Sequence, residues 1–174
     1  EISRLRQRNQ RLTWRMWVNS PRILVRQIPS KPPYCIHACY EEDYILNDRN
    51  SMNIVNITCA PHFMLGVLNS KLISYWFIHK FGKLQRGIFP QFKINELAIF
   101  PIPSCSDALK ERIETVSERI MELMRAEEKS SSIKAQLEEL NKALDHLVYE
   151  AFALDSTQVD EIERDLSQYA ATVS

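Results

Sequence analysis

The dense apolar segment 61–82 constrains the fold more than any other part of the chain. Pro61 suits the first turn of a helix, because its missing N–H needs no partner there. Gly82 suits the left-handed position that follows a helix end. Apolar residues recur between them at helical spacing, namely Leu65, Leu68, Leu72 and Trp76. Further apolar neighbours widen the surface beyond one stripe, so the sequence predicts a long, mostly buried central helix.

Polar residues interrupt this apolar segment, namely Asn69, Ser70, Lys71, His79 and Lys80. A membrane-spanning helix needs about 20 consecutive, predominantly apolar residues. No uninterrupted run of that length remains in the segment, so we expect no membrane span.

Three short segments before the predicted helix have the alternation and the β-branched residues of strands: 22–28, 34–40 and 52–58. Pro21 and Pro29 bound the first, and the polar segment 41–51 connects the second to the third. We expect a small sheet packed on the central helix.

The chain after Pro103 has heptad-like spacing. One apolar seam contains Leu109, Ile113, Val116, Ile120 and Leu123, and a second contains Ile133, Leu137, Leu140, Leu144 and Leu147. The two seams are out of phase by one residue, which argues against one continuous coiled coil. The simplest arrangement is an antiparallel, coiled-coil-like hairpin of helices 107–128 and 133–152, turning at the serines between them. Pairing with another chain, as in a homodimer, is the alternative.

A short amphipathic helix is predicted after the hairpin. Asp155 and Gln158 have the spacing of a helix start, and Val159, Ile162 and Leu166 supply its apolar face. The fold class predicted from the whole chain is α+β. A small β-sheet packs on a long central helix, and the helical hairpin and a short C-terminal helix follow.

The net charge of zero hides a division between the two parts of the chain. Residues 1–104 contain 14 Lys and Arg against 6 Asp and Glu, whereas residues 105–174 contain 8 against 16. A basic part followed by an acidic part suggests that only the first part faces a polyanion. Five arginines crowd the start of the chain: Arg4, Arg6, Arg8, Arg11 and Arg15. Because a charge run is not specific, we favour a solvated lead-in at 1–20 over a phosphate contact.

Three motifs together resemble a known family. LGVLNSKL at 65–72, INELAIFPIP at 94–103 and LVYEAFAL at 147–154 occur in this order, with a Gly-containing loop between the first two. They are similar to the TaqI-like C-terminal specificity domain of type IIG restriction-modification enzymes and adenine-specific DNA methyltransferases. Related target-recognition domains occur in type I specificity subunits. The resemblance covers roughly residues 22–166.

The resemblance implies a division of labour. Residues 1–104 would form a target-recognition domain for double-stranded DNA, and residues 105–174 a helical spacer and docking region. The partner would be a methyltransferase or nuclease domain of the same parent protein. S-adenosylmethionine and Mg²⁺ are expected for that parent and no cofactor for this chain. The first residue is Glu and no apolar signal segment follows, so we expect a piece of a longer, cytoplasmic protein.

The candidate DNA contacts are Arg, Lys and Gln residues of the basic part. Arg and Lys bond to guanine, Gln and Asn bond to adenine, and other basic residues position the backbone. The candidates for base contact are Gln85, Arg86 and Gln91, with Lys83 and Lys93 beside them. The candidates for phosphate contact are Arg22, Arg26, Lys31 and Lys71. The alternative for each is an ordinary surface residue.

Catalysis within this chain is not indicated. The sequence Lys31-Pro32-Pro33-Tyr34 resembles the Asn-Pro-Pro-Tyr motif of amino-methyltransferases, but lysine offers no acceptor to the base's amino group. A rigid turn is the better interpretation. With three glycines in the chain there is no Gly-rich turn for S-adenosylmethionine. We assign no catalytic residue and no metal ligand, and interpret the four scattered cysteines as reduced thiols.

Two rival functions are weighed against DNA recognition. A structural or assembly protein would act through the 107–152 hairpin and would show no salt-sensitive DNA binding. A self-contained methyltransferase or nuclease would turn over substrate unaided, and the missing cofactor motif argues against it.

Overall fold

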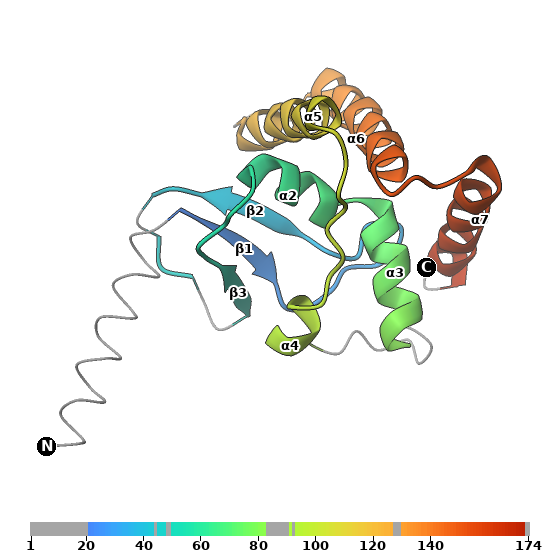
Figure 1. Cartoon of the computed structure of the whole chain (residues 1–174), viewed down its shortest axis with the longest axis horizontal. Coiled ribbons are helices and arrows are strands. Elements are labelled where there is room, and N and C mark those ends of the chain that lie inside the picture. Colours follow the sequence, from blue (N-terminus) through green and yellow to red (C-terminus); the bar gives the residue numbers. More distant parts are fainter. Residues whose placement is uncertain are drawn as a thin grey trace, which may run out of the picture.

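The computed structural model describes residues 21–43, 45–47, 50–82, 91, 93–126 and 130–172. Within them a three-stranded sheet is covered by helix α2 (Pro61–Leu68), and a helical hairpin lies across α2 on the side away from the sheet (Figure 1). This arrangement confirms the predicted α+β class.

The sheet has the strand order β2-β1-β3, with both pairs antiparallel. Strand β1 (Arg22–Arg26) is central, between β2 (Ala38–Glu41) and β3 (Ser51–Ile54). Each strand overlaps its predicted segment but is shorter. Ile23 and Val25 of β1 are fully buried, as expected for alternate residues that face a core.

The predicted central helix is two helices, so the prediction of one continuous helix is wrong. Helix α2 ends at Leu68, and α3 (Lys71–Phe81) begins after Ser70. The Ser70 hydroxyl accepts from the Ile73 N–H at 3.3 Å and donates to the Val67 carbonyl at 2.7 Å. The Asn69 side chain donates to the Ala38 carbonyl and accepts from its N–H, at 3.0 and 2.8 Å. Polar side chains therefore stabilise the break and fasten it to β2.

The predicted ends of this apolar segment are confirmed. Pro61 occupies the first turn of α2, and Gly82 follows α3 with a left-handed φ of 58°. Within α2, Gly66 allows close packing against the hairpin. A Cβ at that position would lie 2.9 Å from Ile113 Cγ2 and 3.1 Å from Leu144 Cδ1.

The remaining helices are α4 (Ile94–Leu97), α5 (Asp107–Arg125), α6 (Ser131–Ala151) and α7 (Ser156–Thr172). Helices α5 and α6 pack together as the predicted hairpin, and α7 packs on α3 (Figure 1). The Asp155 carboxylate accepts from the Gln158 backbone N–H at 2.9 Å, and the Gln158 side-chain Oε1 accepts from the Asp155 backbone N–H at 3.0 Å. The predicted start of α7 is therefore confirmed as a capping box.

One hydrophobic cluster joins the sheet to all the long helices. It includes Ile23 of β1, Phe77 of α3, Ile113 of α5, Val148 of α6 and Leu166 of α7. The sheet and the helical region therefore share a core. No helix in the described part of the chain is long and apolar enough to cross a membrane.

Candidate nucleic-acid interface

Exposed polar side chains gather where β1 ends. Arg26 is exposed, its N–H donates to the His37 carbonyl at 2.9 Å, and Ser51 of β3 is its partner in the register. The next residue, Gln27, donates its N–H to the Asn50 carbonyl at 2.7 Å. Backbone pairing therefore fixes where these side chains leave the sheet. We name this region the sheet end and define it by Arg26, Lys31, His37, Asn50 and Gln91.

Gln91 connects the segment before α4 to the sheet end. Its Nε2 donates to Asn50 Oδ1 at 3.3 Å, and both side chains are exposed. Lys93, two residues later, is exposed at the start of α4, where its N–H donates to the Glu96 carboxylate at 2.7 Å. The predicted base contact Gln91 and the neighbouring candidate Lys93 therefore both lie at the surface.

The other two predicted base contacts, Gln85 and Arg86, and the neighbouring candidate Lys83 lie outside the described residues. Two of the four phosphate candidates, Arg26 and Lys31, are exposed. The Arg26 guanidinium donates to Ser30 Oγ at 3.3 Å, in the turn that carries Lys31.

Arg22 is buried, with 0% of its surface exposed. Its guanidinium donates to the carbonyl of Asp43 at 3.3 Å and to that of Ile45. These bonds hold the segment after β2 against the start of β1. A guanidinium without solvent exposure is poorly placed to meet a phosphate, so we remove Arg22 from the contact set.

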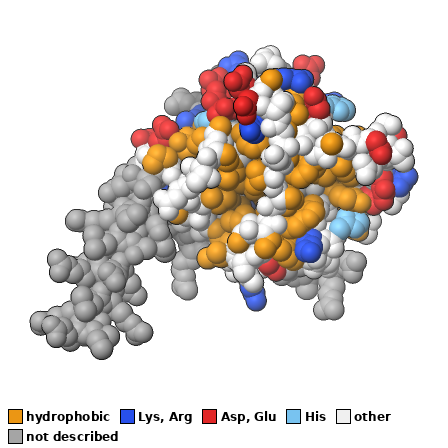
Figure 2. Space-filling view, viewed as in Figure 1, with side chains coloured by type: hydrophobic (Ala, Val, Ile, Leu, Met, Phe, Trp, Pro, Cys, Tyr) orange, Lys and Arg blue, Asp and Glu red, His pale blue; other side chains and the backbone are white. Residues whose placement is uncertain are grey.

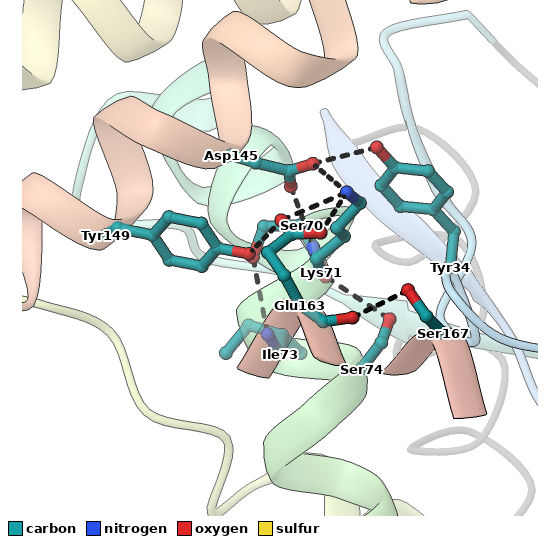
Figure 3. Close-up of polar contacts among 9 residues, drawn as sticks. All are labelled: Tyr34, Ser70, Lys71, Ile73, Ser74, Asp145, Tyr149, Glu163 and Ser167. Atoms are coloured by element: carbon teal, nitrogen blue, oxygen red, sulfur yellow. Dashed lines mark hydrogen bonds and ion pairs between the residues drawn. The ribbon is translucent and has the colours of Figure 1, made fainter. Parts of the chain in front are cut away.

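Lys71 also turns inward (Figure 3). Its Nζ lies 2.7 and 3.0 Å from the two carboxylate oxygens of Glu163 and 3.9 Å from Asp145. Its backbone N–H donates to Asp145 Oδ1 at 2.8 Å. With this ammonium engaged inside the molecule, we remove Lys71 from the contact set as well.

Two tyrosines complete this internal network. The Tyr34 hydroxyl donates to Asp145 Oδ2 at 2.8 Å, and the Tyr149 hydroxyl donates to Glu163 Oε1 at 2.9 Å (Figure 3). We name Tyr34, Lys71, Asp145, Tyr149 and Glu163 the polar clamp. It joins the turn after β1 and helix α3 to helices α6 and α7.

Asp145 is the most buried charge of the polar clamp, with 1% of its surface exposed. Burial raises the pKa of its carboxyl to about 6, although the hydrogen bonds from the Lys71 N–H and the Tyr34 hydroxyl act in the opposite direction. Burial also raises the pKa of both tyrosines. Sequence reasoning missed this group, because an aspartate beside an apolar helix seam carries no local signal of burial.

The motifs weighed as alternatives have structural roles. Lys31-Pro32-Pro33-Tyr34 forms a turn, as predicted, and its tyrosine belongs to the polar clamp. Cys35 is fully buried, and burial raises the pKa of its thiol to about 12. Among the described residues no group of three or more Cys, His, Asp or Glu could hold a metal ion.

The basic excess of the first 104 residues lies largely outside the described ranges. Of its 14 Lys and Arg, the structure describes six: Arg22, Arg26, Lys31, Lys71, Lys80 and Lys93. In Figure 2 acidic side chains gather at the top, over the α5–α6 hairpin. The hairpin side of the molecule is therefore a poor surface for a polyanion.

Comparisons with known proteins identify a family and a similar fold. Residues 2–102 match the TaqI-like C-terminal specificity domain family. No curated protein matches the chain. Among solved structures, the type IIL restriction-modification enzyme MmeI in complex with DNA is similar, with a TM-score of 0.59 at 12% sequence identity. The match covers 90% of this chain and 22% of the MmeI chain, so this chain spans about a fifth of that protein.

Proposed function

This chain belongs to the TaqI-like C-terminal specificity domain family, and from that membership we propose that it recognises a specific sequence in double-stranded DNA. It does so as a module of a restriction-modification enzyme, directing a methyltransferase or endonuclease carried elsewhere in the parent protein to its site. The observation that carries the proposal is the family match, which spans the sheet, α2, α3 and α4. The fold similarity to MmeI, a restriction-modification enzyme solved with DNA, supports it.

The sheet end supplies chemistry suited to this function. Gln91 carries an amide of the kind that pairs with adenine N6 and N7, and Arg26, Lys31 and Lys93 carry charges that neutralise phosphates. Lys83, Gln85 and Arg86, which precede Gln91 in the sequence, remain proposed contacts. Phosphate contacts would set the register of the chain on the duplex, and the base contacts would discriminate sequence.

The helical region has a positioning role in this proposal. The polar clamp and the shared core fix α6 and α7 relative to the sheet, so a domain that docks on the helices is held at a set distance from the bound DNA. S-adenosylmethionine and Mg²⁺ would be bound by the parent's other domains. A cytoplasmic setting is part of this proposal.

Selection of random duplex DNA by the purified chain at two salt concentrations tests the proposal. We expect enrichment of a short motif and an affinity that falls steeply as salt rises. Replacing Arg86 with Ala should cost about 1–3 kcal/mol of specific binding and relax one base-pair preference.

Binding without enrichment would contradict sequence recognition by this chain alone. It would mean that discrimination between DNA sequences requires the whole parent protein. An absence of binding even at low salt would contradict the proposal. It would favour the alternative of an assembly protein that acts through the α5–α6 hairpin, which analytical ultracentrifugation would then detect as oligomerisation.

A further inference from the structure

We propose that Arg26 and His37 together bind one phosphate of the DNA backbone, and that His37 takes up a proton when this phosphate binds. The inference rests on the proposed function and adds to it a contact that makes the affinity for DNA depend on pH. His37 is not among the contacts predicted from sequence, because a histidine before a strand carries no local signal of its neighbour across the sheet.

The two residues lie opposite each other on neighbouring strands. The antiparallel register pairs Val25 of β1 with Ala38 of β2. The Arg26 N–H donates to the His37 carbonyl at 2.9 Å, which continues the pairing by one residue. Directly opposite residues have Cβ atoms about 4.5–5.5 Å apart. A guanidinium and an imidazole at this spacing can both reach one phosphate.

Both side chains point to the face of the sheet opposite to α2. Successive residues of a strand alternate between the two faces, and Ile23 and Val25 are buried in the core that α2 covers (Figure 1). Arg26, the next residue, therefore points away from α2, and so does His37 opposite it. Both residues are exposed, so a duplex can reach them.

The positive charge of this pair is not balanced within the described part of the chain. Each described arginine of the helices lies 2.9–3.9 Å from a carboxylate, namely Arg112, Arg119, Arg125 and Arg164. Arg26 has no carboxylate partner among the described residues, and its guanidinium donates to the neutral Ser30 hydroxyl at 3.3 Å. The group that acts on the His37 charge is Arg26, which repels it. An anion from outside would balance both.

His37 is neutral in the free chain at neutral pH. Partial burial lowers the pKa of its imidazole below the ordinary value, and the positive charge of Arg26 lowers it further. A phosphate bound between the two side chains would reverse this balance, because its negative charge offsets Arg26 and favours the imidazolium. The pKa of His37 is therefore higher in the DNA complex than in the free chain.

The other groups around His37 do not compete with Arg26 for this control. Tyr34 and Cys39 line the same hollow, and burial raises the pKa of both side chains, so both are neutral. Helices α5 and α6 contribute uncharged side chains to this hollow, namely Ser117, Ile120, Met121, Met124 and Asn141.

The sign of the pH dependence follows from the two pKa values of His37. Because the complex holds the proton more tightly than the free chain, the affinity for DNA rises as the pH falls through the pKa of the complex. It levels off below the pKa of the free chain. One linked proton changes the affinity by at most about tenfold per pH unit.

The test is binding of a short DNA duplex of mixed sequence at low, constant salt between about pH 8 and pH 6. A mixed sequence suffices because a phosphate contact carries no sequence information. We expect the affinity of the unaltered chain to rise about three- to tenfold over this range, and that of His37→Gln to rise much less. His146→Gln is the matched control, since it removes an exposed histidine from α6 and should keep the full rise. Titration of Asp145 is common to all three proteins and cancels in the comparison.

NMR titration of the His37 imidazole is a second measurement that needs no folded variant of His37. Addition of the duplex to the unaltered chain should raise the pKa of His37. In the free chain Arg26→Ala should also raise it, because the opposing charge is removed. An unchanged pKa in both experiments would overturn the inference.

The outcomes separate the inference from the proposed function. Binding with the same pH dependence in the unaltered chain and in His37→Gln would overturn the inference and leave the proposed function standing. A changed sequence preference in His37→Gln would also overturn it, by making His37 a base contact. If the unaltered chain bound no duplex even at low salt, the inference and the proposed function would fail together.

Discussion

The polar clamp and the sheet end are both built from polar side chains that the fold brings together from distant segments, but they differ in burial. In the polar clamp, Asp145 is buried and Lys71 is ion-paired with Glu163. At the sheet end, Arg26, Asn50 and Gln91 are exposed. Arg22 and Arg26 show the same contrast within one strand, because the first is buried against backbone carbonyls. Burial, and not residue type, distinguishes a side chain that is used within the fold from one that is accessible to a partner.

Removing Asp145 should break the polar clamp and produce the largest effect. Asp145→Ala leaves the Lys71 N–H and the Tyr34 hydroxyl without their acceptor, and we expect about 3–5 kcal/mol less free energy of unfolding. Urea denaturation measures it. Asp107→Ala is the matched control, since it removes an aspartate from an exposed ion pair with Lys110, and it should change stability little. Equal effects of the two variants would contradict a structural role for the polar clamp.

Protonation of Asp145 should alter stability with a defined sign. Its pKa is raised to about 6 in the folded chain, against about 3.9 when unfolded. The folded state therefore binds this proton more tightly, so the stabilisation that comes from protonating Asp145 is fully present below about pH 4 and is lost as the pH rises through about 6. Relative to Asp145→Asn, the unaltered chain should gain up to about 3 kcal/mol as the pH falls through this range. Parallel melting curves from pH 4 to 7 would show the difference, and a constant offset between the two proteins would refute it.

Two contacts join the sheet to the helices: the polar clamp and the apolar contact between α2 and the hairpin. Gly66→Ala tests the second of these. The new Cβ would lie 2.9 Å from Ile113 Cγ2, so either the Ile113 side chain or one of the two helices must shift. We expect a loss of about 1–3 kcal/mol in the free energy of unfolding. The double variant with Asp145→Ala would show whether the two contacts act independently. Unchanged stability in Gly66→Ala would mean that α2 and α5 are not closely packed.

Arg26→Ala should have the smallest effect, and we expect that effect to be limited to contacts made at the sheet end. The proposed loss of one phosphate contact predicts a few-fold weaker DNA binding at all sequences and a salt slope lower by about one. Binding titrations at several salt concentrations measure both. Arg119→Ala, which removes an exposed arginine from α5, should leave binding unchanged. A change of sequence preference in Arg26→Ala would instead make Arg26 a base reader.

Sequence periodicity predicted the elements whose signals are local. The strands, the hairpin and the capping box of Asp155 and Gln158 depend on neighbours within a few residues, and all were found. The division of the chain at residue 104 stays a prediction. The break between α2 and α3 was missed, although Ser70 caps α3 through bonds to residues only three positions away. The bonds of Asn69 to Ala38, which lies 31 residues away, carry no local signal.

The roles of the basic residues could not be predicted for the same reason. Lys71 was interpreted as a phosphate contact, but its partner Glu163 lies 92 residues away in a helix of the acidic part. Arg22 was given the same role, and its partners lie 21 and 23 residues away in an irregular segment. A count of Lys and Arg in the sequence includes such side chains among those available to DNA. Only the tertiary structure shows that they are bonded to partners within the fold.

The outer edge of β2 has a consequence for solubility. As the first strand in the order β2-β1-β3, it would present unpaired backbone groups to other molecules. The Asn69 amide instead occupies both backbone groups of Ala38, and Arg125 donates to the Tyr40 carbonyl at 3.3 Å. Two side chains therefore close this edge to a strand from another chain, and the helix break that carries Asn69 also protects the protein against edge-to-edge aggregation.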